Sequence, residues 1–452
     1  MPASRNRPHP PAPDPEPDPS AWTFAIRALR HRNYRLFFGG QSISLIGTWM
    51  TRIATSWLVY RLTHSALLLG LIGFSGQIPI LLLGPFAGVW VDRWDRRRTL
   101  VVTQVLSMVQ SFWLAGLALA HVITVGDVVG LSLFQGAINA FDMPARQAFV
   151  VQMVEEREDL SNAIALNSSM VNGARLIGPS LAGLIIAAVG EGYCFLLDGI
   201  SYIAVIASLL LMVIQVAQPR SRHTRVFAEL REGWQYVSRS VPIRSILLLL
   251  ALVSLVGMPY TVLMPIFAGR VLHGGAHTLG FLMGASGVGA LTGAVLLATR
   301  RSVRGLGRVV MMTSMGFGIG LFSFASSHWL ALSLPLMMLT GFCMMTQMAS
   351  SNTILQTIVH EDKRGRVMSF YAMAFQGTAP FGSLIAGAAA SRIGAPRTLM
   401  IGGAICVLGG LWFSRQLPKI RVVVRPIYRK LGIIPEVAAG MQAAALTSPP
   451  EE

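Results

Sequence analysis

Twelve long apolar runs, separated by short polar gaps, constrain the fold of this chain more than any other feature. A helix needs about 20 mostly apolar residues to cross a bilayer, and only helices and closed barrels satisfy their own backbone hydrogen bonds in lipid. We therefore expect an all-α membrane protein with twelve transmembrane helices. The runs lie near residues 36–60, 66–91, 99–121, 126–143, 161–188, 194–216, 245–269, 278–298, 309–327, 329–353, 367–391 and 396–414.

The composition also favours a membrane protein. Hydrophobic residues make up 53% of the chain and charged residues 13%, and the mean hydropathy is +0.57. A soluble domain carries about 25% charged residues. The net charge of +17 would suggest nucleic-acid binding in a soluble protein. Here the positive residues fall in gaps between apolar runs, so we expect a lipid bilayer as partner and no nucleic acid.

The distribution of lysine and arginine predicts the orientation. With the N-terminus inside, 31 of the 37 Lys and Arg residues fall in inward loops and tails, against four in outward loops. Cytoplasmic loops carry such an excess of positive charge. We expect a multi-pass protein of the cell membrane, the inner membrane where a cell has two, with both termini cytoplasmic.

One long polar gap, Gln218–Arg244, divides the apolar part of the chain, and it contains a candidate interfacial helix near Phe227–Val237. The predicted segments are a disordered cytoplasmic N-terminal tail (1–30), an N-terminal six-helix bundle (31–217), a cytoplasmic linker (218–244), a C-terminal six-helix bundle (245–414) and a basic cytoplasmic C-terminal tail (415–452).

A weak internal repeat relates the two halves. Several small residues recur at the same distance along the chain, which indicates two parallel six-helix bundles related by pseudo-symmetry. At a shift of 204 residues, Gly178, Ala182, Gly183 and Gly190 match Gly382, Ala386, Gly387 and Gly394.

The densest charge cluster between apolar runs is Gly88-Val-Trp-Val-Asp92-Arg93-Trp-Asp95-Arg96-Arg97-Arg98. It cannot lie in hydrocarbon, so we expect a tight loop at one membrane face, with Gly88 small enough for close helix approach. The spacing Gly-x-x-x-Asp-Arg-x-x-Arg-Arg resembles the signature loop after the second helix of the major facilitator superfamily, although that family usually has Gly in place of Asp95.

This resemblance implies a twelve-helix transporter and a gating role for the loop residues Gly88, Asp92, Arg93, Arg96 and Arg97. In the outward-facing state Asp92 would lie near the positive N-terminal end of the eleventh helix, around Arg366–Ser369, and hold the inner gate closed. The alternative is a basic anchor in which Asp92 is incidental.

Two further motifs resemble this superfamily. Gln135-Gly-Ala-Ile-Asn-Ala140 is similar to the end of its fourth-helix motif, but the arginine expected three residues earlier is Ser132, which weakens the case for simple proton antiport. Gly178-Pro179-Ser-Leu-Ala-Gly183 resembles the fifth-helix motif of exporters. Pro179 would loosen the helix and the small residues would permit close packing, giving a deformable seam; the alternative is an ordinary kinked helix.

Three segments together resemble one branch, that of enterobactin-type siderophore exporters and macrolide efflux pumps. Asp142 and Arg146 in the first segment, and Arg364 and Arg366 in the third, are candidate inner-loop residues with either a structural or a gating role. The segments are Phe141–Ala148, Leu160–Ser168 and Arg364–Ser369.

Ionisable residues inside predicted membrane helices are candidates for substrate binding or coupling, because each costs about 3 kcal/mol unless paired or hydrated. Arg52 and Arg175 are either structural cations or functional ones. Thr48, Arg52, Thr55 and Ser56 share one polar helical face, so a cation at Arg52 would attract an anionic or electron-rich substrate. Asp198 is the nearest candidate partner for Arg52, or else an exposed helix-end acid.

Uncharged polar residues supply further candidates for a cavity lining. In the fold that the resemblance implies, the first, fourth, seventh and tenth helices flank a central path. The favoured residues on these helices are Gln41, Trp57, Gln135, Asn139 and Gln347. Burial in contacts between helices is the alternative for each of them.

The sequence lacks a phosphate-binding Gly-x-x-x-x-Gly-Lys-Ser/Thr loop, a His-Glu-x-x-His motif and a Gly-x-Ser-x-Gly elbow, and its three cysteines lack metal spacing. We therefore expect no cofactor, no metal and no enzyme activity. The expected function is secondary-active export of a small amphiphilic drug-like or siderophore-like molecule, with protons as the coupling ion in an antiport cycle. A lysophospholipid flippase or other lipid-handling protein on the same scaffold is the alternative.

Overall fold

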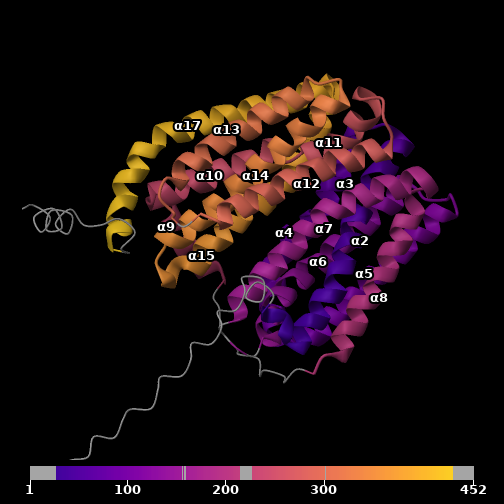
Figure 1. Cartoon of the computed structure of the whole chain (residues 1–452), viewed down its shortest axis with the longest axis horizontal. Helices are drawn as coiled ribbons and strands as arrows, with labels where there is room; N and C mark the ends of the chain where they lie inside the picture. The colour runs from indigo at the N-terminus through magenta and orange to yellow at the C-terminus, as the bar shows by residue number, and fades with distance from the viewer. Residues whose placement is uncertain (1–26, 155, 157–158, 214–225, 301, 431–452) are drawn as a thin grey trace, which may run out of the picture.

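The computed structural model describes residues 27–154, 156, 159–213, 226–300 and 302–430, which are almost entirely helical and contain no strand. Figure 1 shows two lobes that correspond to the two halves of the chain. The first lobe contains η1 (Arg27–Arg30), α2 (Arg32–Thr63), α3 (Ala66–Ser75), α4 (Ile78–Arg93), α5 (Arg96–Leu119), α6 (Val125–Met153), α7 (Leu160–Val189) and α8 (Glu191–Leu211).

The second lobe follows a single helix, α9 (Val226–Arg239). It contains α10 (Val241–Val256), α11 (Tyr260–Ile266), the π-turn η3 (Phe267–Val271), α12 (Ala276–Ala298), α13 (Leu306–Ala325), α14 (Leu330–Ile358), α15 (Glu361–Ala372), the π-turn η4 (Met373–Gly377), α16 (Ala379–Ile393) and α17 (Ala395–Lys430).

These elements form the twelve membrane-spanning units in two six-helix bundles that the sequence predicts, and this architecture is confirmed. Three of these units are each broken into two helical segments: between α3 and α4, between α10 and α11, and between α15 and α16. Pro79, Pro259 and Pro380 lie at or just before the first turn of the segment that follows each break. A proline is tolerated there because its missing N–H would have no partner inside the helix.

Nine stretches in the described part of the chain are long and apolar enough to cross a membrane. The other three units are α2, α6 and the α15–α16 pair. Two of them carry predicted site residues in their interiors, namely Arg52 in α2 and Gln135 and Asn139 in α6. Polar residues inside a spanning helix lower its mean hydropathy and mark it as a candidate for function.

Local capping explains where several helices begin. Asp95 caps α5 by accepting hydrogen bonds from the backbone N–H groups of Arg97 and Arg98, at 2.9 and 3.1 Å. Thr124 and Asp127 form a reciprocal capping box at the start of α6. Asp95, which stands where the superfamily that the loop resembles usually has glycine, is therefore the N-cap of α5.

The helix ends define two faces. The terminal face carries the starts of α2, α5, α7 and α10 and the end of α17; the opposite face carries the α2–α3, α5–α6, α7–α8 and α16–α17 connections. Arg61 near the end of α2 forms a two-point ion pair with Glu191 at the start of α8, at 2.8 and 3.1 Å, on the opposite face.

Two glycine seams join the bundles. Between α7 and α12, a Cβ added to Gly183 would lie 2.9 Å from the Cα of Gly280; between α3 and α16, a Cβ added to Gly387 would lie 2.8 Å from the Cα of Gly70. Both pairs lie in the part of their helices nearer the opposite face. Gly183 and Gly387 are also partners in the 204-residue repeat, so the repeat in sequence corresponds to equivalent contacts in space.

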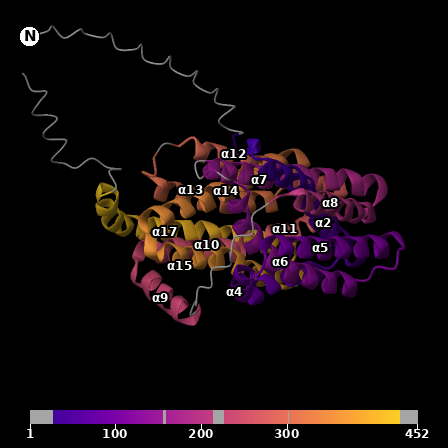
Figure 2. The same ribbon diagram turned by 90° about the horizontal axis from the view of Figure 1, so that it is seen from below.

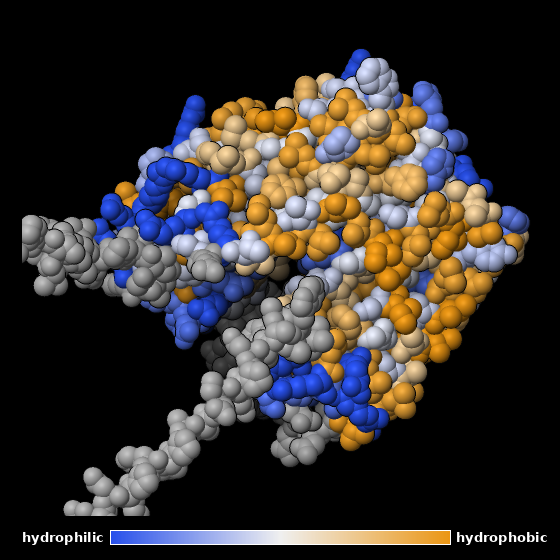
Figure 3. All heavy atoms as spheres, viewed as in Figure 1, coloured by the Kyte–Doolittle hydropathy of each residue, from blue (hydrophilic) through white to orange (hydrophobic). Residues whose placement is uncertain are grey.

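The lobes diverge toward the terminal face. In Figure 1 they meet near α11 and α3 and separate toward α4, α9 and α15. Figure 3 shows that the molecular surface is hollowed between the two lobes on this side. Figure 2 shows α9 beside α15, at the end of the second lobe from which α17 projects. The structure is thus open toward the terminal face.

Some boundaries differ from those expected. The predicted interfacial helix is present as α9. However, α17 continues to Lys430, through residues from 415 onward that were expected to form a tail, and η1 occupies the end of the expected N-terminal tail. The rest of both predicted tails, residues 1–26 and 431–452, lies outside the described residues.

Candidate functional site

Two arginines lie against one tryptophan between the bundles. The Cζ atom of Arg52 on α2 is 4.8 Å from the ring centroid of Trp49, and the Cζ atom of Arg175 on α7 is 5.8 Å from the same centroid. Cation–π contacts of this kind contribute about 0.5–2 kcal/mol, less than the roughly 3 kcal/mol cost of each membrane-embedded arginine. The indole ring alone therefore does not compensate these charges.

The site reaches across to the second bundle. Arg175 Nη2 lies 3.7 Å from the sulfur of Met344 on α14. Arg52 has an exposed side chain, although it is about 16 Å from the nearer end of α2 at 1.5 Å per residue. Because Arg52 shares the Trp49 ring with Arg175, which contacts Met344 of the other bundle, it lies on the side of α2 that faces the second bundle.

Asp198 is not the partner of Arg52. Its side chain is 1% exposed, and its Oδ2 accepts hydrogen bonds from Thr51 at 2.8 Å and Ser111 at 2.9 Å. The interpretation of Asp198 as an exposed helix-end acid is also excluded. It lies two turns into α8, where a Cβ added to Gly47 would be 2.6 Å from its Oδ1. Within the described residues Asp198 has no cationic partner.

The predicted polar residues of α6 form a chain with α5. Gln135 donates to Ser107 Oγ at 3.1 Å and to Asn139 Oδ1 at 3.2 Å. Closer to the terminal face, Asp142 is 2% exposed and accepts from Thr103 and Gln104 at 2.9 and 2.8 Å.

Asp142 also forms an ion pair with Arg146, one turn further along α6. The carboxylate thus links α5 to α6 and has its own counter-ion. Of the two roles left open for Asp142, this geometry favours the structural one.

The loop between α4 and α5 has several separate contacts. Arg97 donates to the backbone carbonyls of Leu209 and Leu210 at 2.8 and 2.7 Å, and so caps the end of α8. Arg96 contacts the carbonyl of Ala148 at 3.5 Å, and the side chain of Arg93 is exposed.

Gly88 does not provide the expected close helix approach. A Cβ added to it would have no atom within 4 Å, so α4 has no tight neighbour at this point in the conformation observed. Asp92 belongs to α4, and its side chain lies outside the described residues.

The linker helix α9 is tied to α15 by a shared carboxylate. Glu232 forms ion pairs with Lys363 and with Arg366, the latter at 2.6 Å. Hydrogen bonds from Lys363 and Arg366 lower the pKa of Glu232, and the hydrogen bond to Glu232 raises the pKa of Lys363. Arg366 is therefore occupied by the linker. Arg364 lies 3.9 Å from the exposed Glu361.

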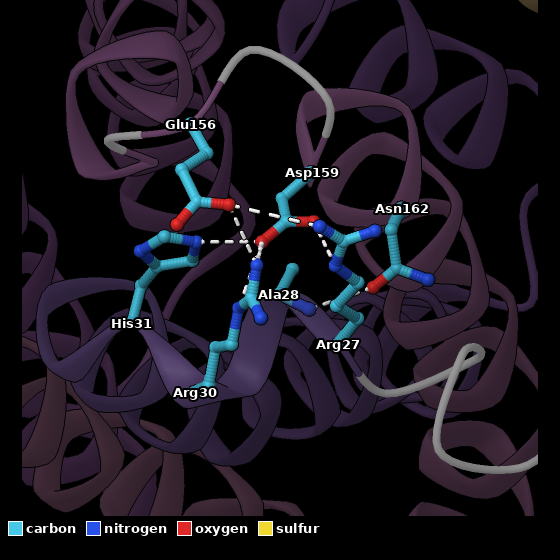
Figure 4. Close-up of polar contacts among 7 residues, drawn as sticks. All are labelled: Arg27, Ala28, Arg30, His31, Glu156, Asp159 and Asn162. Carbon is cyan, nitrogen blue, oxygen red and sulfur yellow. Dashed lines mark hydrogen bonds and ion pairs between the residues drawn. The ribbon is translucent and has the colours of Figure 1, made fainter. Parts of the chain in front are cut away.

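A second ion cluster fixes the start of α2 to the start of α7 (Figure 4). The Asp159 carboxylate, whose side chain is 0% exposed, pairs with Arg27 at 2.7 Å, Arg30 at 2.8 Å and His31 at 2.8 Å. Burial opposes its charge, but the hydrogen bonds from His31 and Arg30 and the charges of Arg27 and Arg30 outweigh this effect, so the pKa of Asp159 is lowered. Glu156 accepts a further bond from Arg30, at 2.7 Å.

The helix-five motif packs on two neighbours. A Cβ added to Gly178 would lie 2.5 Å from the Cβ of Trp49, whereas one added to Gly183 would meet α12 of the other bundle. Pro179 lies between them inside the continuous helix α7. Gly178 therefore positions Trp49 within the first bundle, and Gly183 belongs to the seam between bundles.

The remaining predicted lining residues are less open than expected. Gln41 and Gln347 are 2% and 1% exposed, so both are buried in this conformation. Trp57 is partly buried, with its ring centroid 5.4 Å from that of Tyr60. Sequence reasoning missed Trp49, Ser111, Met344 and Asp159, because a tryptophan, a hydroxyl, a thioether or a loop acid has no distinctive spacing without its spatial partners.

Twelve spanning helices in two pseudo-symmetric bundles, with two arginines between them, are the architecture of a multi-pass membrane transporter. Residues 23–425 match the family described as transmembrane secretion effector, MFS_3, and the chain belongs to this family of the major facilitator type. This confirms the superfamily that the loop, fourth-helix and fifth-helix motifs resemble.

The curated relatives are transporters. The chain is 26% identical to the staphyloferrin A transporter of Staphylococcus aureus (strain NCTC 8325 / PS 47), over 86% of this chain and 98% of that one. It is 22% identical to macrolide efflux protein A of Streptococcus pyogenes, over 84% and 95% of the two chains. Among solved structures, a mutant of the nucleoside transporter NupG superposes with a TM-score of 0.67 at 12% identity, covering 86% of this chain and 99% of that one, which shows a shared fold.

Proposed function

We propose that this protein is a secondary-active exporter that moves a small amphiphilic molecule by alternating access, coupled to protons, with its terminal face in the cytoplasm. One observation carries the proposal: the bundles are joined at glycine seams near the opposite face and diverge toward the terminal face, with Arg52 and Arg175 between them. The named relatives, a staphyloferrin A transporter and a macrolide efflux protein, support export of a siderophore-like or drug-like molecule.

Glycine seams suit a rocking motion. Where backbones meet without side chains, helices can pivot with few interlocked side chains to separate. Rocking about Gly183–Gly280 and Gly70–Gly387 would close the hollow on the terminal face and open the opposite face. In that closed state, the loop of Gly88, Asp92 and Arg93 would meet the first turns of α15, which begins at Glu361 and not near Arg366–Ser369 as expected. The helix N-terminus and Arg364 would favour the charge of Asp92 there, against the opposing charges of Glu361 and Asp362.

Asp198 is the proposed proton carrier. It is buried in the spanning region, it has hydroxyl partners and no cationic partner within the described residues, and its Oδ1 has no hydrogen-bond partner. The titratable groups near it are Cys194 and Tyr202 of its own helix. Keeping a carboxyl group ionised in this buried setting costs free energy, and uptake of a proton removes that cost. Asp142, by contrast, already has Arg146.

A lipid-handling role is the second candidate, and a groove of about 690 Å³ between α4, α5 and α6 favours it. Val102, Leu106 and Phe134 give it apolar walls, and Arg93 and Arg98 lie at its terminal end. The groove lies within one bundle, however, and Arg52 and Arg175 do not line it. Comparing lysophospholipid translocation by Arg98→Gln and by Arg52→Gln would separate the candidates, because only the lipid role predicts a selective loss in the first variant.

Thiol labelling tests alternating access. The native Cys194, Cys343 and Cys406 are buried, so background labelling should be low. Thr48→Cys places a thiol on an exposed position of α2, one turn from Arg52. We expect an impermeant maleimide to label it in inverted vesicles, and in right-side-out vesicles only when the protein visits the outward-open state.

Two exposed positions serve as orientation controls. Ser302→Cys, on the terminal face, should react only in inverted vesicles, and His121→Cys, on the opposite face, only in right-side-out vesicles. The reverse pattern would disprove the assigned orientation. Labelling of Thr48→Cys from one side under all conditions, with or without a pH gradient, would disprove alternation.

A further inference from the structure

We propose that Trp49, Arg52 and Arg175 form the binding site for an anionic group of the transported molecule, a carboxylate or similar oxyanion attached to an apolar body. This inference rests on the proposed transport function and names the substrate class that the site accepts. Trp49 and Met344 would contact the apolar body, and the two guanidinium groups would bind the anion.

The first argument is the absence of a fixed counter-ion. Within the described residues neither Arg52 nor Arg175 forms an ion pair with a carboxylate, although both lie on one indole ring. The acids of the first bundle's interior are occupied elsewhere. Asp142 pairs with Arg146, and Asp198 accepts from Thr51 and Ser111. Two like charges held close together inside the membrane region repel each other, and an anion between them removes that repulsion.

The second argument is position. Arg52 comes from α2, Arg175 from the middle of α7, and the contact to Met344 crosses to α14 of the other bundle. A ligand at this point touches both bundles, so its binding energy changes when they rock. Alternating access requires a site between the two moving bodies.

The third argument is selectivity. Arginine donates in a planar fork that fits carboxylate and phosphate oxygens, and it also stacks on aromatic rings. Trp49 is held in place because the backbone of Gly178 lies directly beneath its Cβ. The same two charges repel cations, so the site favours amphiphilic anions and disfavours lipophilic cations.

Binding can be measured on the purified full-length protein in nanodiscs, without a gradient. The probes are carboxyfluorescein and 1-naphthoate as anions with an apolar ring system, and rhodamine 123 as a cation with a ring system related to that of carboxyfluorescein. We expect at least one anion to raise the melting temperature of the wild-type protein and rhodamine 123 to leave it unchanged. Arg52→Gln and Arg175→Gln should each weaken anion binding about tenfold or more, and Arg52→Lys should restore part of it.

Ligand-free stability distinguishes a binding role from a structural one. The Gln variants should melt at or above the wild-type temperature, because the repulsion between the two cations is gone. Arg421→Gln, at an exposed position of α17, is the matched control and should bind like the wild type. A lowered melting temperature in both Gln variants would assign the arginines a structural role. Failure of both anions to bind, or equal binding of rhodamine 123, would overturn the proposal while leaving the labelling test of transport intact.

Discussion

Gly183 of α7 and Gly280 of α12 meet with no side chain between them: a Cβ added to either would lie 2.9 Å from the Cα of the other. Gly387 and Gly70 repeat this relationship between α16 and α3. These two contacts, near the opposite face, are among those that join the bundles; along the same pair of helices, a Cβ added to Gly287 would lie 2.9 Å from the Cα of Leu176. The conformation of the protein therefore depends on how closely the backbones can approach at these points.

Gly183→Leu should force the seam apart and shift the protein away from the conformation observed. Overpacking costs about 1–3 kcal/mol, and about 1.4 kcal/mol changes a two-state equilibrium tenfold. We expect greater labelling of Thr48→Cys from the opposite face. Gly173→Leu on the same helix is the control, because a Cβ there has no atom within 4 Å. Equal labelling of the two variants would show that the seam does not set the equilibrium.

Gly178→Leu should behave differently from Gly183→Leu. A Cβ at Gly178 would meet Trp49 and the carbonyl of Ile46 inside the first bundle, at 2.5 and 3.0 Å. We expect a lower melting temperature and loss of anion binding, because Trp49 is displaced, with little change in which face is open. A variant that is stable but locked in one state would instead place Gly178 in the gate.

Asp92→Asn should leave folding and insertion intact and slow transport several-fold. Charge–dipole interactions at helix ends contribute about 0.3–1 kcal/mol when exposed, and up to about 2 kcal/mol when partly buried. Efflux at matched expression is the measurement. A wild-type efflux rate in the Asn variant would show that Asp92 has no gating role and that the loop acts only as a basic anchor.

Asp198→Asn should abolish the dependence of transport on the proton gradient without unfolding the protein. The amide oxygen can still accept from Thr51 and Ser111, but the side chain can no longer take up a proton. Glu191→Gln is the matched control on the same helix, because Glu191 already has Arg61 as its partner. If Asp198→Asn kept the wild-type pH profile of efflux, the proton would be carried elsewhere.

Asp142→Asn should mainly destabilise the protein. Loss of one partner from a buried ion pair costs about 3–5 kcal/mol, and because the Arg146 side chain is 26% exposed we expect a smaller loss of about 1–3 kcal/mol. Thermal unfolding in detergent measures it. A wild-type melting temperature combined with impaired transport would assign Asp142 to gating.

The sequence by itself determined the twelve spans, because whether a segment crosses a bilayer depends on its own length and hydrophobicity, which are local properties. It also specified the pseudo-symmetry, through the 204-residue repeat that Gly183 and Gly387 share, and the family, through the loop that begins at Gly88. The polar face of Arg52 followed from helical spacing alone.

Only the tertiary structure decided which polar groups meet. The sequence makes Asp198 the nearest candidate partner for Arg52, yet Asp198 accepts hydrogen bonds from Thr51 and Ser111, while Arg52 lies beside Trp49 and Arg175. Gly88, expected to pack tightly, has open space, and Gly280, which the sequence did not single out, forms the seam. Helix rotation and packing set these contacts, and they depend on side chains from several helices at once, which no local spacing encodes.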